Sequence, residues 1–169
     1  MNKFGFWLLP PKEVQAEYKK VIDKYSGRLK TPSFEPHITI LGTVKGDREE
    51  IIGKVEKIAL NISPIEIMIS DITISTTYHQ CVFARIKPTP SLLDAHLDLK
   101  DVLDSTTKGM YVPHMSLIYG DISLKEKNEI AEEIQLTTSN FQADRLCVVN
   151  TDDLDPKTWT HVAEFELRS

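Results

Sequence analysis

Two short segments of this chain carry the same pattern of chemically useful residues. Each reads aromatic, any residue, Pro, His, apolar, hydroxyl, apolar, first at 34–40 and again at 111–117. Because successive side chains of a strand point to opposite faces, His37 and Thr39 share one face, and so do His114 and Ser116. Two imidazoles with adjacent hydroxyls can supply a general base, a general acid and hydrogen-bond donors. That is the equipment for attack on a phosphate without a metal ion.

Coincidence is a poor explanation for the repeated pattern. Proline fills 9 of 169 positions and aromatic residues make up 8% of the chain, so a histidine rarely acquires both at these offsets by chance. The alternative interpretation of His37 and His114 is a pair of half-buried strand histidines bonded to the backbone. The repeat, together with Thr39 and Ser116, favours catalysis. One histidine would be the base and the other the acid, and the sequence leaves open which is which.

The elements around the two segments correspond as well. His37 and His114 are 77 residues apart, and the same offset relates Pro11 to Pro88. In each half, hydrophobic periodicity and N-cap residues predict a strand, prolines, a helix, the histidine strand, a second helix and then alternating strands. The expected ranges are strands at 4–9, 65–75, 81–86, 141–149 and 158–167, and helices at 13–25, 47–60, 91–103 and 123–134.

This order predicts an α+β fold made by duplication. Each half alone would expose the apolar face of a small sheet, so we expect a bilobal, pseudo-twofold domain covering 1–169, with halves at about 1–78 and 79–169. Two antiparallel sheets would face each other across a central cleft, with the helices outside. The histidine strands would line that cleft.

Length and composition indicate a small-molecule enzyme rather than a polyanion-binding protein. A chain of 169 residues with a formal net charge of −5 can bury a core without staples, and it repels a long polyanion unless basic residues gather locally. Cys81 and Cys147 lie in apolar runs and are too few for a disulfide scaffold, which favours a reduced, cytoplasmic context. The beginning of the sequence shows no secretory signal, and we expect no membrane contact.

The paired motifs resemble those of the two-histidine phosphoesterases, whose signature is a pair of His-x-Thr/Ser motifs on facing strands. Within that superfamily the flanking residues are similar to the cyclic phosphodiesterases of plants and fungi. Three stretches carry this resemblance, at 6–11, 34–39 and 113–121. It implies a bilobal fold of two antiparallel sheets, no metal or other cofactor, and opening of a cyclic phosphodiester in a nucleotide-like substrate.

The same resemblance implies roles for two aromatic residues. Trp7 would stack on a base or line the cleft, and Tyr119 would contact the phosphate or an attacking water. Trp7 alternates with the apolar residues Phe6 and Leu8, so it need not belong to their core, although a core position is the alternative. Tyr119 has the opposite parity to His114, so it reaches the site only if the strand ends or bends there.

Other candidate sites are weak. His79, His96 and His161 lack the motif and are interpreted as surface or interface histidines without chemistry. Neither motif offers a second ligand at a metal-binding interval, and the cysteines are isolated in the sequence, so we expect no metal site. A glycine-rich phosphate loop and a GxSxG elbow are both absent from the sequence.

Three functions remain open, and one leads. The leading hypothesis is metal-independent hydrolysis of a nucleoside 2′,3′-cyclic phosphate or of ADP-ribose 1″,2″-cyclic phosphate. The alternatives are processing of RNA ends that carry a 2′,3′-cyclic phosphate, which would want a local basic strip, and a non-catalytic nucleotide-binding module. We expect a monomer, although the sequence itself does not determine whether the chain dimerises.

Overall fold

The computed structural model describes residues 2–168. Each helix and strand of the sequence prediction is present within a few residues of its expected range, apart from one strand that is divided. The elements are β1 (Asn2–Leu9), α1 (Lys12–Leu29), β2 (Ile38–Gly46), α2 (Arg48–Ala59), β3 (Ile65–Ile74), β4 (Val82–Ile86), α3 (Pro90–Val102), β5 (His114–Ile118), α4 (Leu124–Glu133), β6 (Asn140–Ala143), β7 (Arg145–Asn150), the 3₁₀ turn η1 (Pro156–Thr158) and β8 (Thr160–Glu166).

The strands form one continuous antiparallel sheet, which corrects the expectation of two separate sheets. Its order is β6-β3-β4-β5-β2-β1-β7-β8. The two four-stranded parts join where β2 pairs with β5 at Ile38 and Met115. The sequence halves do not stay apart either, because β3 of the first half pairs with β4 of the second. The fold is therefore α+β, with the histidine strands as neighbours at the centre of one sheet.

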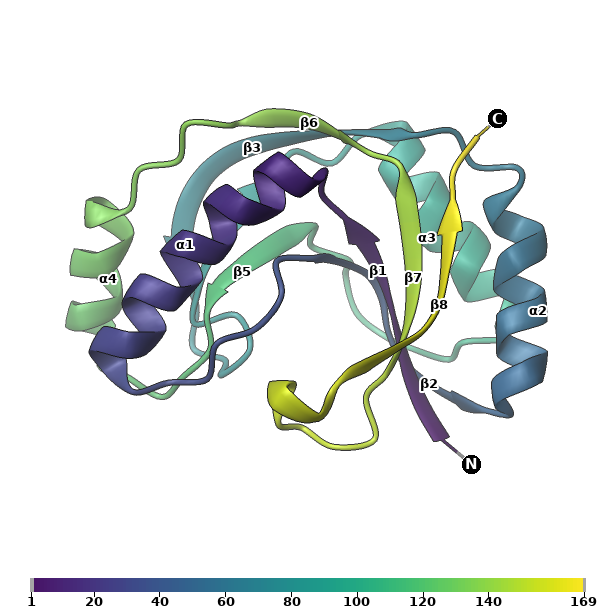
Figure 1. The fold of residues 1–169 in the computed structure, drawn as a ribbon, viewed down its shortest axis with the longest axis horizontal. Helices are drawn as coiled ribbons and strands as arrows, with labels where there is room; N and C mark the ends of the chain where they lie inside the picture. The colour runs from purple at the N-terminus through teal and green to yellow at the C-terminus, as the bar shows by residue number, and fades with distance from the viewer. Residues whose placement is uncertain (1, 169) are drawn as a thin grey trace.

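The sheet is strongly curled. β6 lies at one edge, whereas β7 is next to the last strand at the other edge, yet only Asp144 separates these two strands in the chain. Figure 1 shows β6 running over the top of the molecule directly into β7. The predicted single strand at 141–149 is thus two strands that pair with β3 and with β1. A run of alternating residues cannot reveal that its two ends join opposite parts of a sheet.

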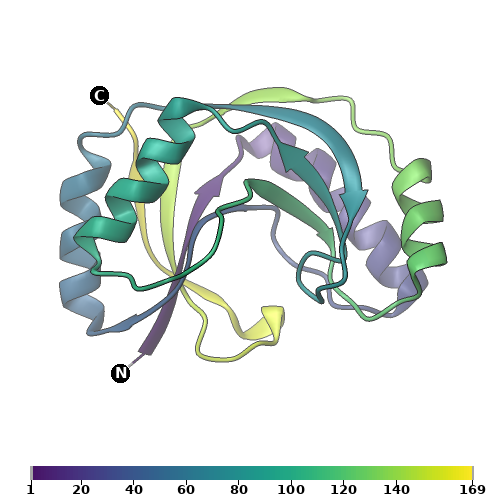
Figure 2. The ribbon, with the colours of Figure 1, turned by 180° about the vertical axis from the view of Figure 1, so that it is seen from behind.

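The helices begin where the sequence supplies caps. The Asp47 side chain accepts hydrogen bonds from the backbone N–H groups of Glu49 and Glu50 at the start of α2, and Ser123 accepts one from Glu126 at the start of α4. Helices α1 and α4 lie over the β3–β5 side, and α2 and α3 lie at the β2, β7 and β8 side. Figure 2 shows the same two helix pairs from behind. Among the described residues, no helix combines the length and apolar character that a membrane crossing requires.

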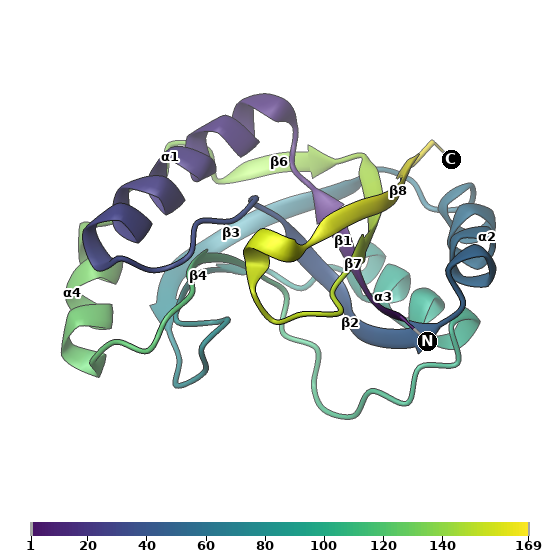
Figure 3. The same cartoon turned by 60° about the horizontal axis from the view of Figure 1, so that its bottom comes forward.

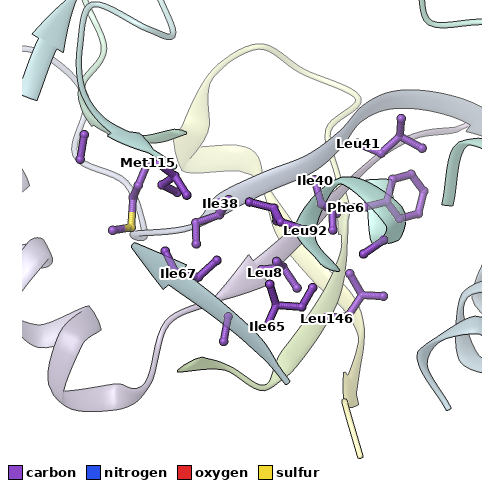
Figure 4. Close-up of a cluster of buried hydrophobic side chains, with 14 of the residues drawn as sticks. Phe6, Leu8, Ile38, Ile40, Leu41, Ile65, Ile67, Leu92, Met115 and Leu146 are labelled. Atoms are coloured by element: carbon purple, nitrogen blue, oxygen red, sulfur yellow. The ribbon is translucent and has the colours of Figure 1, made fainter. Parts of the chain in front are cut away.

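Alternation along the strands separates the main core from a second face. In β1, Phe6 and Leu8 belong to the large buried cluster, whereas Trp7 and Leu9 belong to a small cluster on the other face. The large cluster draws side chains from both parts of the sheet and from all four helices. Figure 4 labels members from five strands and from α3: Phe6, Leu8, Ile38, Ile40, Leu41, Ile65, Ile67, Leu92, Met115 and Leu146. The opposite face of these strands carries the candidate site. The segment with η1 lies across the concave side of the curled sheet (Figure 3).

Candidate active site

The two histidine motifs meet where the sheet halves join. Ile38 of β2 is the antiparallel partner of Met115 of β5. Both side chains point into the main core, so their neighbours in sequence face the other way. Continuing the register places His37 beside Ser116 and Thr39 beside His114, in a diagonal arrangement of two imidazoles and two hydroxyls.

Both imidazoles are oriented by the same backbone bond. Nδ1 of His37 lies 2.7 Å from the carbonyl oxygen of Glu35, and Nδ1 of His114 lies 2.8 Å from that of Val112. A carbonyl oxygen only accepts, so Nδ1 carries the proton in each ring. Nε2 is then the basic nitrogen of each neutral imidazole, and it is the atom that can accept or return a proton.

Burial keeps both imidazoles neutral. The side chain of His37 is 6% exposed, and its burial lowers its pKa to about 4, against the opposing effects of the Glu35 carbonyl and carboxylate. Burial also lowers the pKa of His114, while its bond to Val112 acts in the other direction. Each Nε2 therefore presents a lone pair at neutral pH.

The six residues that the sequence singled out line one pocket. Its volume is about 370 Å³, which suits a nucleotide-sized ligand. Histidines, hydroxyl side chains and aromatic rings dominate the lining, and one carboxylate, Asp153, contributes. The lining residues include Trp7, His37, Thr39, Tyr78, His79, Gln80, His114, Ser116, Tyr119, Asp153, Leu154 and Trp159.

Trp7 forms part of the pocket wall, and its ring does not project into the pocket. Its ring stacks on His37 with a centroid separation of 3.6 Å and an interplanar angle of 12°. Only 5% of Trp7 is exposed, and Cys147 and Val149 pack on it from β7. Trp7 therefore lines the cleft, as one of its two expected roles, and it also fixes the plane of the His37 ring.

Tyr119 reaches the pocket because β5 is bulged before it ends. Val82 pairs with Ile118 and Phe83 pairs with Ser116, so one extra residue of β5 lies between these pairs. A bulge reverses the facing of the residues beyond it, which is the bend that the parity argument required. Tyr119 then stacks on Phe34 at 3.7 Å, hydrogen-bonds the Ser116 side chain, and has its pKa raised by burial.

Sequence reasoning missed three lining residues. His79, interpreted as a surface or interface histidine, lies in the β3–β4 hairpin, and its backbone carbonyl accepts a 2.7 Å hydrogen bond from the Ser116 hydroxyl. The amide nitrogen of Gln80 lies 3.0 and 3.1 Å from the two nitrogens of the His114 ring, so it packs against that ring. Trp159 precedes β8 and contacts Trp7 at 5.6 Å in an edge-to-face arrangement.

No motif marks these three positions, because hairpins and loops bring them to the pocket from elsewhere in the chain. The one available signal was composition. The chain has two tryptophans, and an aromatic of this size in a polar segment such as 151–160 favours a binding role.

Comparison with known proteins places the chain in a family. Residues 1–167 match the family described as cyclic phosphodiesterase-like proteins. The chain belongs to this cyclic phosphodiesterase-like family. Its members are phosphoric diester hydrolases. The Arabidopsis thaliana protein named cyclic phosphodiesterase is 26% identical over 171 residues, which cover 97% of this chain and 94% of that protein.

Solved structures share the fold of this cyclic phosphodiesterase-like chain. The Thermus thermophilus protein TT0787 superposes with a TM-score of 0.69 at 14% identity, over 99% of this chain and 98% of that one. Escherichia coli LigT in complex with NADP⁺ superposes with a TM-score of 0.66 at 11% identity, over 99% and 98%. At these identities the likeness shows the fold.

A second layer of residues supports His37 in this cyclic phosphodiesterase-like protein. The Glu35 side chain lies 2.6 Å from Nε2 of His161 on β8 and accepts a 3.2 Å hydrogen bond from Gln15 on α1. Glu35 is thus held through both its side chain and its backbone, because its carbonyl oxygen accepts a hydrogen bond from Nδ1 of His37. The hydrogen bonds of Cys147 and Glu35 raise the pKa of His161, so this part of the molecule attracts positive charge.

Neither His96 nor His161 joins the pocket. His96 stacks on Tyr111 at 4.2 Å, and its Nδ1 donates to the carbonyl of Ile40. Tyr111 in turn donates to the carbonyl of Thr39 over 3.1 Å. These two residues therefore brace β2 behind the site. His161 lies at the surface, where its Nε2 is 2.6 Å from the Glu35 carboxylate.

Proposed function

We propose that this protein hydrolyses a cyclic phosphate of a small nucleotide, either a nucleoside 2′,3′-cyclic phosphate or ADP-ribose 1″,2″-cyclic phosphate. The observation that carries the proposal is the matched orientation of His37 and His114 in one pocket. Each Nδ1 is bonded to a backbone carbonyl, so each Nε2 is available for proton transfer. Two such nitrogens on either side of a phosphorus atom can serve an in-line displacement.

The proposed reaction includes two proton transfers, one from water to a histidine and one from the other histidine to the leaving oxygen. Nε2 of one histidine takes a proton from water as the water oxygen attacks phosphorus, and a P–O bond of the ring breaks. Nε2–H of the other histidine gives its proton to the departing sugar oxygen, which leaves a phosphomonoester. A bound phosphate anion favours the protonated form of a neighbouring imidazole, so the substrate itself supplies the charge that burial disfavours.

Thr39 and Ser116 are proposed to bind the non-bridging oxygens. Both hydroxyls line the pocket beside the histidines, and both can donate to oxygens on which charge develops. The Ser116 hydroxyl donates to the carbonyl of His79, and a bound phosphate would replace that bond. Tyr119, next to Ser116, would contact the phosphate or the water.

The outer part of the pocket suits a nucleobase. Trp159 and the half-exposed Tyr78 line it, and aromatic rings bind bases of any sequence by stacking. A nucleotide substrate is also consistent with the LigT crystal structures that contain NADP⁺ and 3′-AMP, since LigT shares this fold. Because the expected mechanism uses imidazoles alone, the reaction should need no metal ion.

One experiment tests substrate, regiochemistry and metal requirement together. The purified protein, treated with EDTA, is incubated separately with a nucleoside 2′,3′-cyclic phosphate and with ADP-ribose 1″,2″-cyclic phosphate, and the products are identified. We expect a single phosphomonoester from at least one substrate. His37→Ala and His114→Ala should each lower turnover about 10²- to 10⁴-fold, whereas Glu56→Ala, at an exposed position of α2 outside the pocket, should retain it. Folded variants of both pocket histidines with full turnover would leave a nucleotide-binding module as the function.

A second candidate substrate is an RNA end with a 2′,3′-cyclic phosphate. A neighbouring hollow of about 240 Å³ shares Thr39, Gln80 and His114 with the pocket and adds Lys100 and Lys108. These lysines form a local basic strip that could hold a further phosphate. A salt titration separates the two candidates, since steep loss of binding with salt indicates a strand and a weak dependence indicates a small substrate.

A further inference from the structure

We propose that Cys147, His161 and Glu164 form a binding site for a zinc-class divalent ion, distinct from the catalytic pocket. One ligand atom from each of these side chains lies within 4.8 Å of the others. Thiolate, imidazole and carboxylate together are ligands that Zn²⁺ prefers over Mg²⁺ or Ca²⁺, which favour oxygen alone. None of the three residues lines the catalytic pocket.

The strand register explains how Cys147, His161 and Glu164 come to lie on the same face of the sheet. Cys147 of β7 is the direct cross-strand partner of Glu164 of β8. His161 and Glu164 would normally point to opposite faces, since they are three residues apart. The register shifts between Val148 and Val149, whose partners are Ala163 and His161. The extra residue of β8 turns His161 toward the face of Cys147 and Glu164.

The orientation of the His161 ring is the second argument. Its Nε2 lies 2.6 Å from a carboxylate oxygen of Glu35, while its Nδ1 lies 3.8 Å from Oε2 of Glu164. Two ligands of one tetrahedral zinc ion are about 3.5 Å apart, so Nδ1 and Oε2 are already close to the required separation. A metal-bound histidine usually donates its other N–H to a carboxylate, which is the role that Glu35 has here.

The remaining contacts are compatible with a bound ion. Arg145 holds Glu164 through Oε1, at 3.1 Å, so Oε2 stays available. Cys147 is fully buried, and its Sγ–H donates only a weak 3.7 Å hydrogen bond to the carbonyl oxygen of Val148. Binding would transfer the thiol proton, and any proton on Nδ1 of His161, to solvent, leaving a thiolate–metal bond and a neutral imidazole ligand. A water would complete four ligands.

The test uses Co²⁺ as a spectroscopic substitute for Zn²⁺, with the EDTA-treated and dialysed full chain. We expect one equivalent of Co²⁺ to give a sulfur-to-metal charge-transfer band and the visible bands of a four-coordinate ion, and one equivalent of Zn²⁺ to abolish them. Cys147→Ser should remove the charge-transfer band. Cys81→Ser, which changes the other buried cysteine, is the matched control and should retain it.

Two further variants keep the test decisive if Cys147→Ser does not fold. Glu164 is 40% exposed at its side chain, so Glu164→Ala should fold and weaken Zn²⁺ binding at least about tenfold. Glu35→Gln should weaken it about 10- to 100-fold, because the ring of His161 loses its orienting carboxylate. Absence of the charge-transfer band in the wild-type protein, or its persistence in folded Cys147→Ser, would overturn the proposal. The readout needs no substrate, so it is independent of the proposed hydrolysis.

Discussion

Ile38 and Met115 form the ladder pair through which β2 joins β5. Each of these residues directly follows a catalytic-candidate histidine, so one backbone pairing sets the separation of the two imidazoles. Their side chains are fully buried on the opposite face. Packing of the core and placement of the site are therefore decided at the same two positions.

Ile38→Ala should affect both the fold and the site. Removing a fully buried Ile side chain leaves a cavity and should lower the free energy of unfolding by about 2–5 kcal/mol. Because the β2–β5 join would relax, kcat should also fall. Chemical denaturation and steady-state kinetics measure the two effects, and Ile38→Val, which should cost about 0.5–1.5 kcal/mol, is the graded control. Full activity in a destabilised Ile38→Ala protein would contradict the coupling.

The pH profile of kcat/KM should have its maximum on the acid side. This parameter reports ionisations of the free enzyme, in which the base must be neutral and the acid protonated. Burial lowers the pKa of both His37 and His114 below the ordinary value. We therefore expect a bell-shaped profile with its maximum below about pH 6.5. A plateau that persists to pH 9 would show that protonation of a histidine is not required.

Tyr119→Phe should separate chemistry from packing. The substitution keeps the ring that stacks on Phe34 but removes the hydroxyl beside Ser116. If that hydroxyl binds the phosphate or the water, kcat/KM should fall about tenfold or more, as expected for a hydrogen bond to a charged group, with no change in melting temperature. Unchanged kinetics would assign Tyr119 to packing alone.

Glu17 provides a test of acid stability away from the site. Burial alone would raise its pKa, but hydrogen bonds from Thr138 and Thr137 lower it to about 2. Its contribution is therefore present above the unfolded pKa of about 4.5 and is lost as the pH falls toward 2. Glu17→Gln should reduce the free energy of unfolding at pH 7 by about 1 kcal/mol, since solvent screens the group. At pH 2 the difference from wild type should shrink, and a difference that stays the same at both pH values would contradict the role of the carboxylate.

The sequence could predict the elements and the paired motifs, because these depend on local physics. Alternation placed Trp7 away from Phe6 and Leu8, as the structure confirms. Asp47 and Ser123 cap the helices that were expected to begin there. The repeated histidine motifs brought four polar side chains to the lining of one pocket.

The sequence-based predictions are wrong where pairing between distant strands decides the structure. Nothing near Asp144 in the sequence indicates that the strand on one side joins β3 and the strand on the other side joins β1. The sequence pattern therefore predicts two sheets where the chain forms one curled sheet. Register shifts between strands also change which face a side chain occupies, and the sequence does not reveal them. The shift in β8 brings His161 to Cys147 and Glu164, although Cys147 has no ligand-type neighbour in sequence.

The two tryptophans should respond differently to substitution, because they hold different parts of the pocket. Trp159 is partly exposed, and its indole N–H donates to the carbonyl of Asp153, so its loss should leave the sheet intact. If it stacks on a base, Trp159→Ala should cost about 1–3 kcal/mol of substrate binding, which is a roughly 5- to 150-fold rise in KM with kcat largely kept.

Trp7→Ala is the contrasting variant. Trp7 is buried and stacked on His37, so this substitution should lower the free energy of unfolding by about 3–5 kcal/mol and reduce kcat by releasing the imidazole ring. Steady-state kinetics with denaturant unfolding distinguish the two patterns. A change in KM alone for Trp7→Ala, or in kcat alone for Trp159→Ala, would show that the assignments of ring support and base stacking are reversed.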